Sequence, residues 1–151
     1  MEKLKVILNH EGYWRDENKN CIPQVSGIFF VYESKYKARD QTIKLKRLLY
    51  IGESDNVQER ICNHPNYKIW KNSLDIYCEL SFSFVPVSCI YRLRIESAYI
   101  STHKPFLNHH SDFSFDFVDT FIISLGRIGF TEPVIDLKKN TQDILSFDEM
   151  G

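Results

Sequence analysis

The sequence predicts an α+β domain in which helices flank a small central antiparallel or mixed sheet of three strands, followed by a C-terminal extension. Residues 27–32, 48–52 and 74–87 are rich in β-forming side chains and supply the three strands. Segments with helical spacing follow the second and third strands. Regular alternation of strand and helix is missing, which disfavours a parallel doubly wound sheet.

Composition favours one ordered domain. The chain has 151 residues, of which 43% are hydrophobic, and this is enough to build a core. Apolar runs stay far below the ~18 residues of a membrane span, and the N-terminus lacks the features of a signal peptide. We expect an N-terminal extension over 1–24, the main domain over 25–110 and an acidic C-terminal extension over 111–151 that packs on the same domain.

The four cysteines indicate a reducing compartment. No C-x-x-C pair is present, so a zinc knuckle or a thioredoxin-like redox site has no support. A chain of this length without an export signal does not need disulfides to fold, and we expect free thiols in a cytoplasmic protein. His109 and His110 have no neighbours at metal-ligand spacing and are interpreted as part of a solvated loop.

The first half of the chain predicts a hairpin. A short strand at 5–8 is followed by a polar connection over 9–24. The continuous apolar run 27–32 is typical of a buried central strand. Residues 33–47 are polar and basic and form either a loop or an exposed hairpin, and the strand 48–52 closes the hairpin with the first.

Helical signals follow the hairpin. Ser54 or Asp55 can cap a helix whose apolar positions extend to Trp70, although Pro65 is expected to end one helix within this segment. After the third strand, Ser88 can cap a helix over 89–103.

The C-terminal part is less regular. Residues 112–117 alternate strongly, 121–130 could form a strand pair or a short helix, and the acidic end over 141–151 is expected to fray.

The residues with chemical potential follow one another in a fixed order. They are Gly27-Ile28-Phe29, Tyr50-Ile51-Gly52, Arg60, His64, Glu96 and Asn108. This order and spacing resemble the GIY-YIG endonuclease superfamily over about 80 residues. Either tripeptide alone would be weak support, but the ordered set is unlikely to arise by chance.

Each residue type also suits phosphodiester chemistry. Arg60 and His64 are four residues apart and would share one helix face, where the Arg fork suits a phosphate and the His can move protons. Glu96 lies within the predicted second helix, and a carboxylate there can bind Mg²⁺, which often takes only one or two protein carboxylates. Hydrolysis needs stabilised charge, an activated water and a proton route to the leaving group.

The resemblance implies specific roles and a reaction. Glu96 would hold Mg²⁺ (or Mn²⁺), Arg60 would clamp a phosphate, and Tyr50 would position water or phosphate. His64 would assist proton transfer or contact phosphate, and Asn108 would hold the architecture of the site. The implied reaction is hydrolysis of DNA that leaves a 5′-phosphate and a 3′-hydroxyl, with RNA as an open alternative.

Plainer interpretations remain open. Glu96 could pair with Arg92 one turn earlier, a contact worth about 0.3–0.5 kcal/mol. Arg60 could pair with a neighbour or cover Trp70, and Gly52 could serve only as a turn residue.

Phe29 departs from the family pattern, in which the first tripeptide ends in Tyr. Phenylalanine has no proton to exchange, and Tyr32 should point to the opposite face of the strand. Two outcomes stay open. His64, Tyr50 or water on the cation could serve as base in a slower or altered nuclease. The domain could instead have lost catalysis and act as a binding module, for example a phage or mobile-element interference protein.

Charge is distributed unevenly along the chain. The overall net charge is −1, yet residues 33–72 carry a net +4 and residues 109–151 a net −5. The basic segment could track backbone phosphates or be a solvated surface. The aromatic and acidic segment 112–121 could bind a protein partner or a second copy of the chain. The candidate phosphate contacts are Lys35, Lys37, Arg39, Lys44, Lys46 and Arg47.

Overall fold

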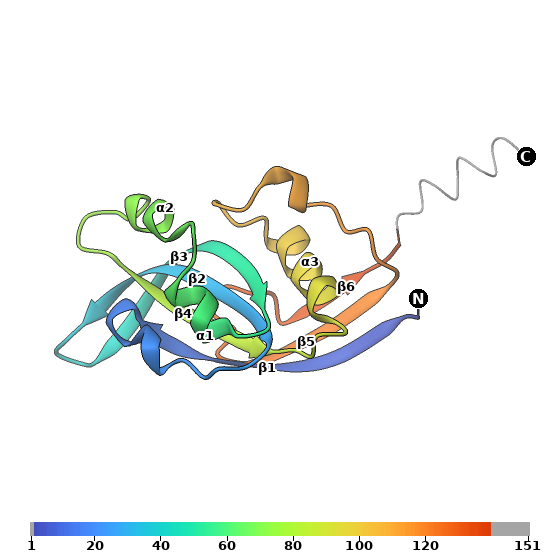
Figure 1. Cartoon of the computed structure of the whole chain (residues 1–151), viewed down its shortest axis with the longest axis horizontal. Coiled ribbons are helices and arrows are strands. Elements are labelled where there is room, and N and C mark those ends of the chain that lie inside the picture. Colours follow the sequence, from blue (N-terminus) through green and yellow to red (C-terminus); the bar gives the residue numbers. More distant parts are fainter. Residues whose placement is uncertain (1, 140–151) are drawn as a thin grey trace, which may run out of the picture.

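The computed structural model describes residues 2–139 and contains one mixed sheet of six strands. The strand order is β3-β2-β4-β1-β5-β6, and the sheet curves around one side of α3 (Figure 1). The predicted three-stranded sheet flanked by helices is therefore wrong. Its three strands form one half of the sheet, and the segments assigned to the two extensions supply the other half.

The predicted hairpin is confirmed. β2 (Gly27–Lys37) and β3 (Thr42–Ser54) pair antiparallel, and the first eight residues of β2 are buried. The apolar run thus forms a central strand, since β2 also pairs with β4 (Glu79–Pro86). Both strands extend into the predicted 33–47 segment, which is the exposed tip of the hairpin.

The N-terminal region differs most from its prediction. Instead of a short strand and a polar connection, β1 (Leu4–Arg15) has 12 residues and is followed by the 3-10 helix η1 (Asp16–Cys21). β1 pairs antiparallel with β4 and parallel with β5 (Thr120–Gly126). These partners are distant in sequence, and they stabilise a polar stretch as strand against its local composition.

The helical segments are shorter than predicted. α1 (Val57–Cys62) and α2 (Tyr67–Asn72) are separate helices, as Pro65 between them predicts. The N-cap of α1 is Asn56 rather than Ser54 or Asp55, and its side chain accepts a hydrogen bond from the Glu59 amide at 3.1 Å.

The second predicted helix starts later than expected. α3 (Arg92–His103) begins three residues after Cys89, and its cap position is Tyr91 rather than Ser88. None of the helices in the described part of the chain is both long and apolar enough to cross a bilayer.

The C-terminal part adds the last two strands. β5 is followed by the short strand β6 (Val134–Leu137), which pairs with it antiparallel. The alternating segment 112–117 is not a strand, and the short 3-10 helix η2 (His110–Asp112) lies at its start. The predicted fraying of 141–151 lies outside the described residues.

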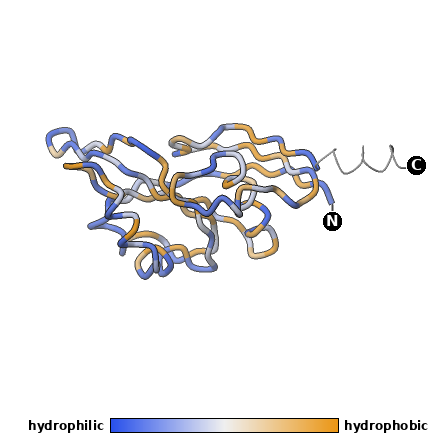
Figure 2. The backbone as a smooth tube through the Cα atoms, turned by 90° about the horizontal axis from the view of Figure 1, so that it is seen from above, coloured by the Kyte–Doolittle hydropathy of each residue, from blue (hydrophilic) through white to orange (hydrophobic). Residues whose placement is uncertain are grey.

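Two apolar cores lie on opposite faces of the sheet. Side chains of alternating residues along β2 diverge, so Phe29 and Val31 pack with α1 and α2, whereas Phe30 and Tyr32 pack with α3. Figure 2 shows the resulting alternation of hydrophobic and hydrophilic stretches along the strands. Tyr32 therefore points away from Phe29, as predicted.

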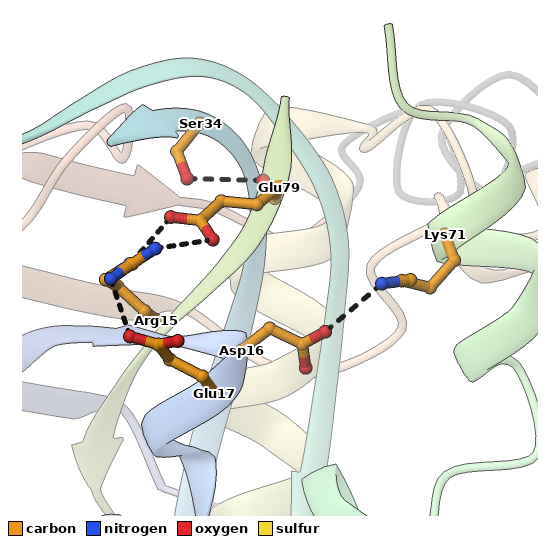
Figure 3. Close-up of polar contacts among 6 residues, drawn as sticks. All are labelled: Arg15, Asp16, Glu17, Ser34, Lys71 and Glu79. Atoms are coloured by element: carbon orange, nitrogen blue, oxygen red, sulfur yellow. Dashed lines mark hydrogen bonds and ion pairs between the residues drawn. The ribbon is translucent and has the colours of Figure 1, made fainter. Parts of the chain in front are cut away.

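Polar contacts fasten the end of β1 to its neighbours. Arg15 binds both carboxylate oxygens of Glu79 on β4, at 2.8 and 3.2 Å, and also pairs with Glu17 (Figure 3). The next residue, Asp16, pairs with Lys71 of α2 at 3.6 Å (Figure 3). These contacts join β1, β4 and α2 on one side of the sheet and hold α2 over it.

Candidate functional site

Tyr50 on β3 is the centre of the candidate site. Its ring lies 5.2 Å from the His64 ring and 6.1 Å from the Phe29 ring, measured between centroids. Trp70 of α2 packs against both Tyr50 and His64, at 5.3 and 4.5 Å. The aromatic rings hold the two polar side chains in fixed orientations.

His64 is buried and held in one tautomer. Its Nδ1 accepts a hydrogen bond from the Asn66 amide at 3.0 Å, so in the neutral ring the proton is on Nε2. Nε2 has no partner within residues 2–139. Burial and the nearby Arg60 guanidinium lower the pKa of His64 to about 4. The side chain is therefore neutral at physiological pH and offers an N–H donor rather than a base.

Arg60 is exposed and lines an open groove of about 570 Å³. The groove lies between the β3–α1 turn, α1 and the start of α3. Across it, Arg92 binds Glu53 and donates to Ser26 at 3.0 Å. Because Arg92 is engaged in this way, Arg60 is the arginine of the groove that can contact an anion. The lining residues are Glu53, Ser54, Asp55, Asn56, Glu59, Arg60, Asn63 and Arg92.

Glu96 on α3 lines a second cavity, of about 250 Å³, together with Tyr50. Burial first, and then the carboxylates of Glu53 and Asp112, raise the pKa of Glu96 to about 7. Within residues 2–139 the Glu96 carboxylate makes no ion pair, so the alternative pairing with Arg92 is not observed.

The electrostatics of Tyr50 link the groove and the cavity. Burial and the Glu96 carboxylate raise the pKa of Tyr50, and the Arg60 guanidinium opposes this rise. Tyr50 thus feels a cation on one side and a carboxylate on the other. With a raised pKa, its hydroxyl stays protonated at neutral pH and can donate a hydrogen bond.

Asn108 holds the strand that carries Tyr50. Its side chain accepts from the Ile51 amide and donates to the Ile51 carbonyl, both at 2.9 Å. β3 is an edge strand, so these outward backbone groups have no neighbouring strand. Leu107 extends the contact by donating to the Leu49 carbonyl at 2.8 Å.

Phe29, which stands where the GIY-YIG pattern has Tyr, is fully buried. Its ring lies directly on Gly52, where an added Cβ would come within 2.7 Å of Phe29 Cε1. Gly52 is thus required by close packing between β2 and β3 rather than by a turn.

The basic residues divide into two groups. Lys35, Lys37, Arg39, Lys44 and Lys46 are exposed on the hairpin tip. Lys35 and Lys44 lie directly opposite one another on the paired strands, and two like charges in this position destabilise the hairpin.

Arg47 does not belong with the exposed group. It pairs with buried Glu33 at 3.2 Å, donates to the Ser73 carbonyl at 2.9 Å and lies over the Phe106 ring. Its guanidinium is therefore committed to structural contacts.

Sequence reasoning missed Glu53 and Asp112, whose charges act on Glu96. Glu53 directly follows the second tripeptide, which could have drawn attention to it. Asp112 carried no local signal, because only folding brings η2 to the cavity that Tyr50 and Glu96 line. His109 and His110 are exposed, as predicted, and residues 2–139 contain no cluster of three His, Cys, Asp or Glu placed to hold a metal.

Comparison with known proteins returned no matching family model, curated protein or solved structure.

Proposed function

We propose that this chain is a Mg²⁺-dependent endonuclease of GIY-YIG type that hydrolyses phosphodiester bonds in DNA. One observation carries the proposal: Tyr50 adjoins His64 and shares a cavity with Glu96, and the Arg60 charge acts on both Tyr50 and His64. These four side chains come from β3, α1, the segment after α1, and α3. Their convergence is what phosphate binding beside a carboxylate requires.

Glu96 fits a hard divalent cation. It is a half-buried carboxylate without an ion pair within residues 2–139, and burial, followed by the neighbouring carboxylates, raises its pKa, so a cation beside it would stabilise the charged form. Mg²⁺ needs few protein ligands because it keeps several waters, and this agrees with a single central carboxylate. When bound, it supplies charge stabilisation and an activated water.

The side chains around Glu96 act mainly as donors. Arg60 provides a guanidinium for a phosphate oxygen and the Tyr50 hydroxyl provides a further hydrogen bond, whereas the His64 Nε2–H lies buried behind Tyr50. At neutral pH the Tyr50 hydroxyl keeps its proton because its pKa is raised, and the neutral His64 ring carries its one proton on Nε2 because the Asn66 amide occupies Nδ1. We therefore assign neither of them to removing a proton from the attacking water.

The hairpin tip is the proposed DNA contact. Lys35 and Lys44 repel one another across the strands, and a phosphate between them would remove that cost. We also propose a cytoplasmic location, in keeping with four free cysteines, Cys21, Cys62, Cys78 and Cys89.

A second candidate function is binding without catalysis. Phe29 favours it, because the fully buried ring brings no hydroxyl to Tyr50 and His64. In this role the protein would occupy nucleic acid, or a protein partner, in stoichiometric amounts.

Incubation with supercoiled plasmid, linear DNA and RNA, with Mg²⁺ or with chelator, tests the proposal. We expect cleavage of DNA with turnover that requires Mg²⁺ and is lost in Glu96→Gln. The matched control Glu11→Gln changes an exposed glutamate on β1 and should cleave normally. Binding without cleavage in both proteins would instead support the non-catalytic role.

Restoring the family tyrosine separates the two functions further. Phe29→Tyr should raise the cleavage rate if the missing hydroxyl limits the reaction. Equal rates would mean that the reaction does not use this position. No activity in either protein, under conditions where DNA is bound, would refute the nuclease proposal.

A further inference from the structure

Within residues 2–139, no helix covers one sheet face of the strands β1, β5 and β6. The inward side chains of these strands pack in one core with α3, which lies over that side of the sheet (Figure 1), and the alternate side chains lie on the opposite face. Ile7 is 61% exposed, Val134 53% and Leu125 47%. Figure 2 shows hydrophobic stretches on the strands near the N-terminus. We call this surface the outer face, and its members are Lys5, Ile7, Asn9, Phe121, Ile123, Leu125, Val134 and Asp136.

The strand register arranges the outer face in rows. Lys5, Phe121 and Asp136 lie side by side across the three strands, and Lys5 Nζ lies 5.5 Å from the centre of the Phe121 ring. The next row consists of three β-branched residues, which are listed here in strand order: Ile7, Ile123 and Val134. One row thus carries a cation at one end and an anion at the other, where exposed Lys138 also lies 3.4 Å from Asp136, and the second row is entirely apolar.

This arrangement is complementary to itself. Rotation by 180° about an axis along β5 places β1 of one copy over β6 of another. Each Lys5 then faces Asp136 of the other copy, while Phe121 and Ile123 meet their own counterparts. A two-fold interface requires such self-complementarity, and stacked sheets with nearly aligned strands are a common packing.

We propose that the outer face is the interface of a homodimer with its two-fold axis along β5. β1 and β5 pair over seven residues and β6 has four, so with strands about 4.8 Å apart and a rise of about 3.4 Å per residue the face covers on the order of 300 Å² per copy. This is less than the ~800 Å² per partner of a standard interface, so the dimer is weak and depends on concentration.

The proposal is independent of the nuclease function. The candidate site lies at the β3 edge, and the outer face lies at the β6 end of the same sheet. The two sites of the dimer would therefore lie at opposite ends of the assembly, and loss of dimerisation should leave the activity per protomer unchanged.

Sedimentation from micromolar to millimolar concentration tests the interface. We expect a reversible shift from monomer to dimer in the unaltered protein. Ile123→Lys should abolish it, because the substitution places two lysines against one another at the axis. Ile76→Lys is the matched control, since Ile76 is 76% exposed outside the sheet, and it should dimerise normally. Circular dichroism verifies that both variants fold.

Charge exchange gives a sharper test. Lys5→Asp and Asp136→Lys should each be monomeric alone, because like charges then face one another at both ends. A mixture of the two variants should form a heterodimer, and the double exchange should dimerise again. An unaltered protein that stays monomeric, or charge variants that dimerise as well as the parent, would overturn the proposal. The unaltered protein would stay monomeric, for example, if residues 140–151 or another protein covered this face instead.

Discussion

Replacing Asn108 with alanine should destabilise the protein by removing the partners of an edge strand. The Asn108 side chain makes two hydrogen bonds of 2.9 Å to the backbone of Ile51, a residue that is fully buried. A buried backbone group left without a partner costs about 1–3 kcal/mol, so two such groups give about 2–6 kcal/mol. A typical domain has a total stability of about 5–15 kcal/mol, so the loss is a large fraction.

Urea denaturation of Asn108→Ala measures this change. The matched control is Asn18→Ala, at an exposed position in η1, which should change the free energy of unfolding by less than about 0.5 kcal/mol. If Asn108→Ala unfolded at the same urea concentration as the parent, the edge-strand argument would be refuted. Asn108 would then matter only for chemistry at the candidate site.

Three further results are expected. Burial first, and then the His103 charge, lower the pKa of His10 to about 4, so between about pH 6.5 and 4 only the unfolded chain binds this proton, and His10 removes about 3 kcal/mol of stability as pH decreases. His64 acts in the same direction and Glu96 in the opposite one, so the measurement is a difference: over this pH range the parent should lose about 3 kcal/mol more than His10→Gln in denaturation experiments. Gly52→Ala should lower the free energy of unfolding by about 1–3 kcal/mol, because the added methyl group clashes with Phe29. Adding Phe29→Leu should recover part of that loss. A Gly52→Ala protein as stable as the parent would contradict the close packing. Replacing Lys35, Lys37 and Lys44 together with glutamine should weaken DNA binding and reduce the steepness of log affinity against log salt concentration by up to about 3. The control, with glutamine at three exposed lysines outside the hairpin (Lys3, Lys138 and Lys139), should keep the slope, and an unchanged slope in the first protein would remove the hairpin as the contact surface.

Local pattern was sufficient for the β2–β3 hairpin. The apolar run from Gly27 and the polar stretch that follows it differ sharply in composition, and the structure has strands and an exposed tip at those places. Pro65 likewise marked the break between α1 and α2, because its ring is incompatible with a continuing helix. Tyr32 could be assigned to the opposite face from Phe29 because side chains alternate along any strand.

Long-range pairing decided the rest of the sheet. Residues 9–15 are polar enough to suggest a loop, yet β4 and β5 pair with them, and neither partner can be identified from the local composition of β1. The same limit applied to Asp112, which reaches Glu96 only through folding.

For the candidate site, the order of residues identified which side chains to examine, and the fold decided what each can do. Burial and the Asn66 amide make His64 a donor, and a pairing with Glu33 removes Arg47 from the basic surface. Residue type and spacing are properties of the chain alone, whereas proton affinity and hydrogen-bond partners depend on burial and on neighbours that only the tertiary structure brings together.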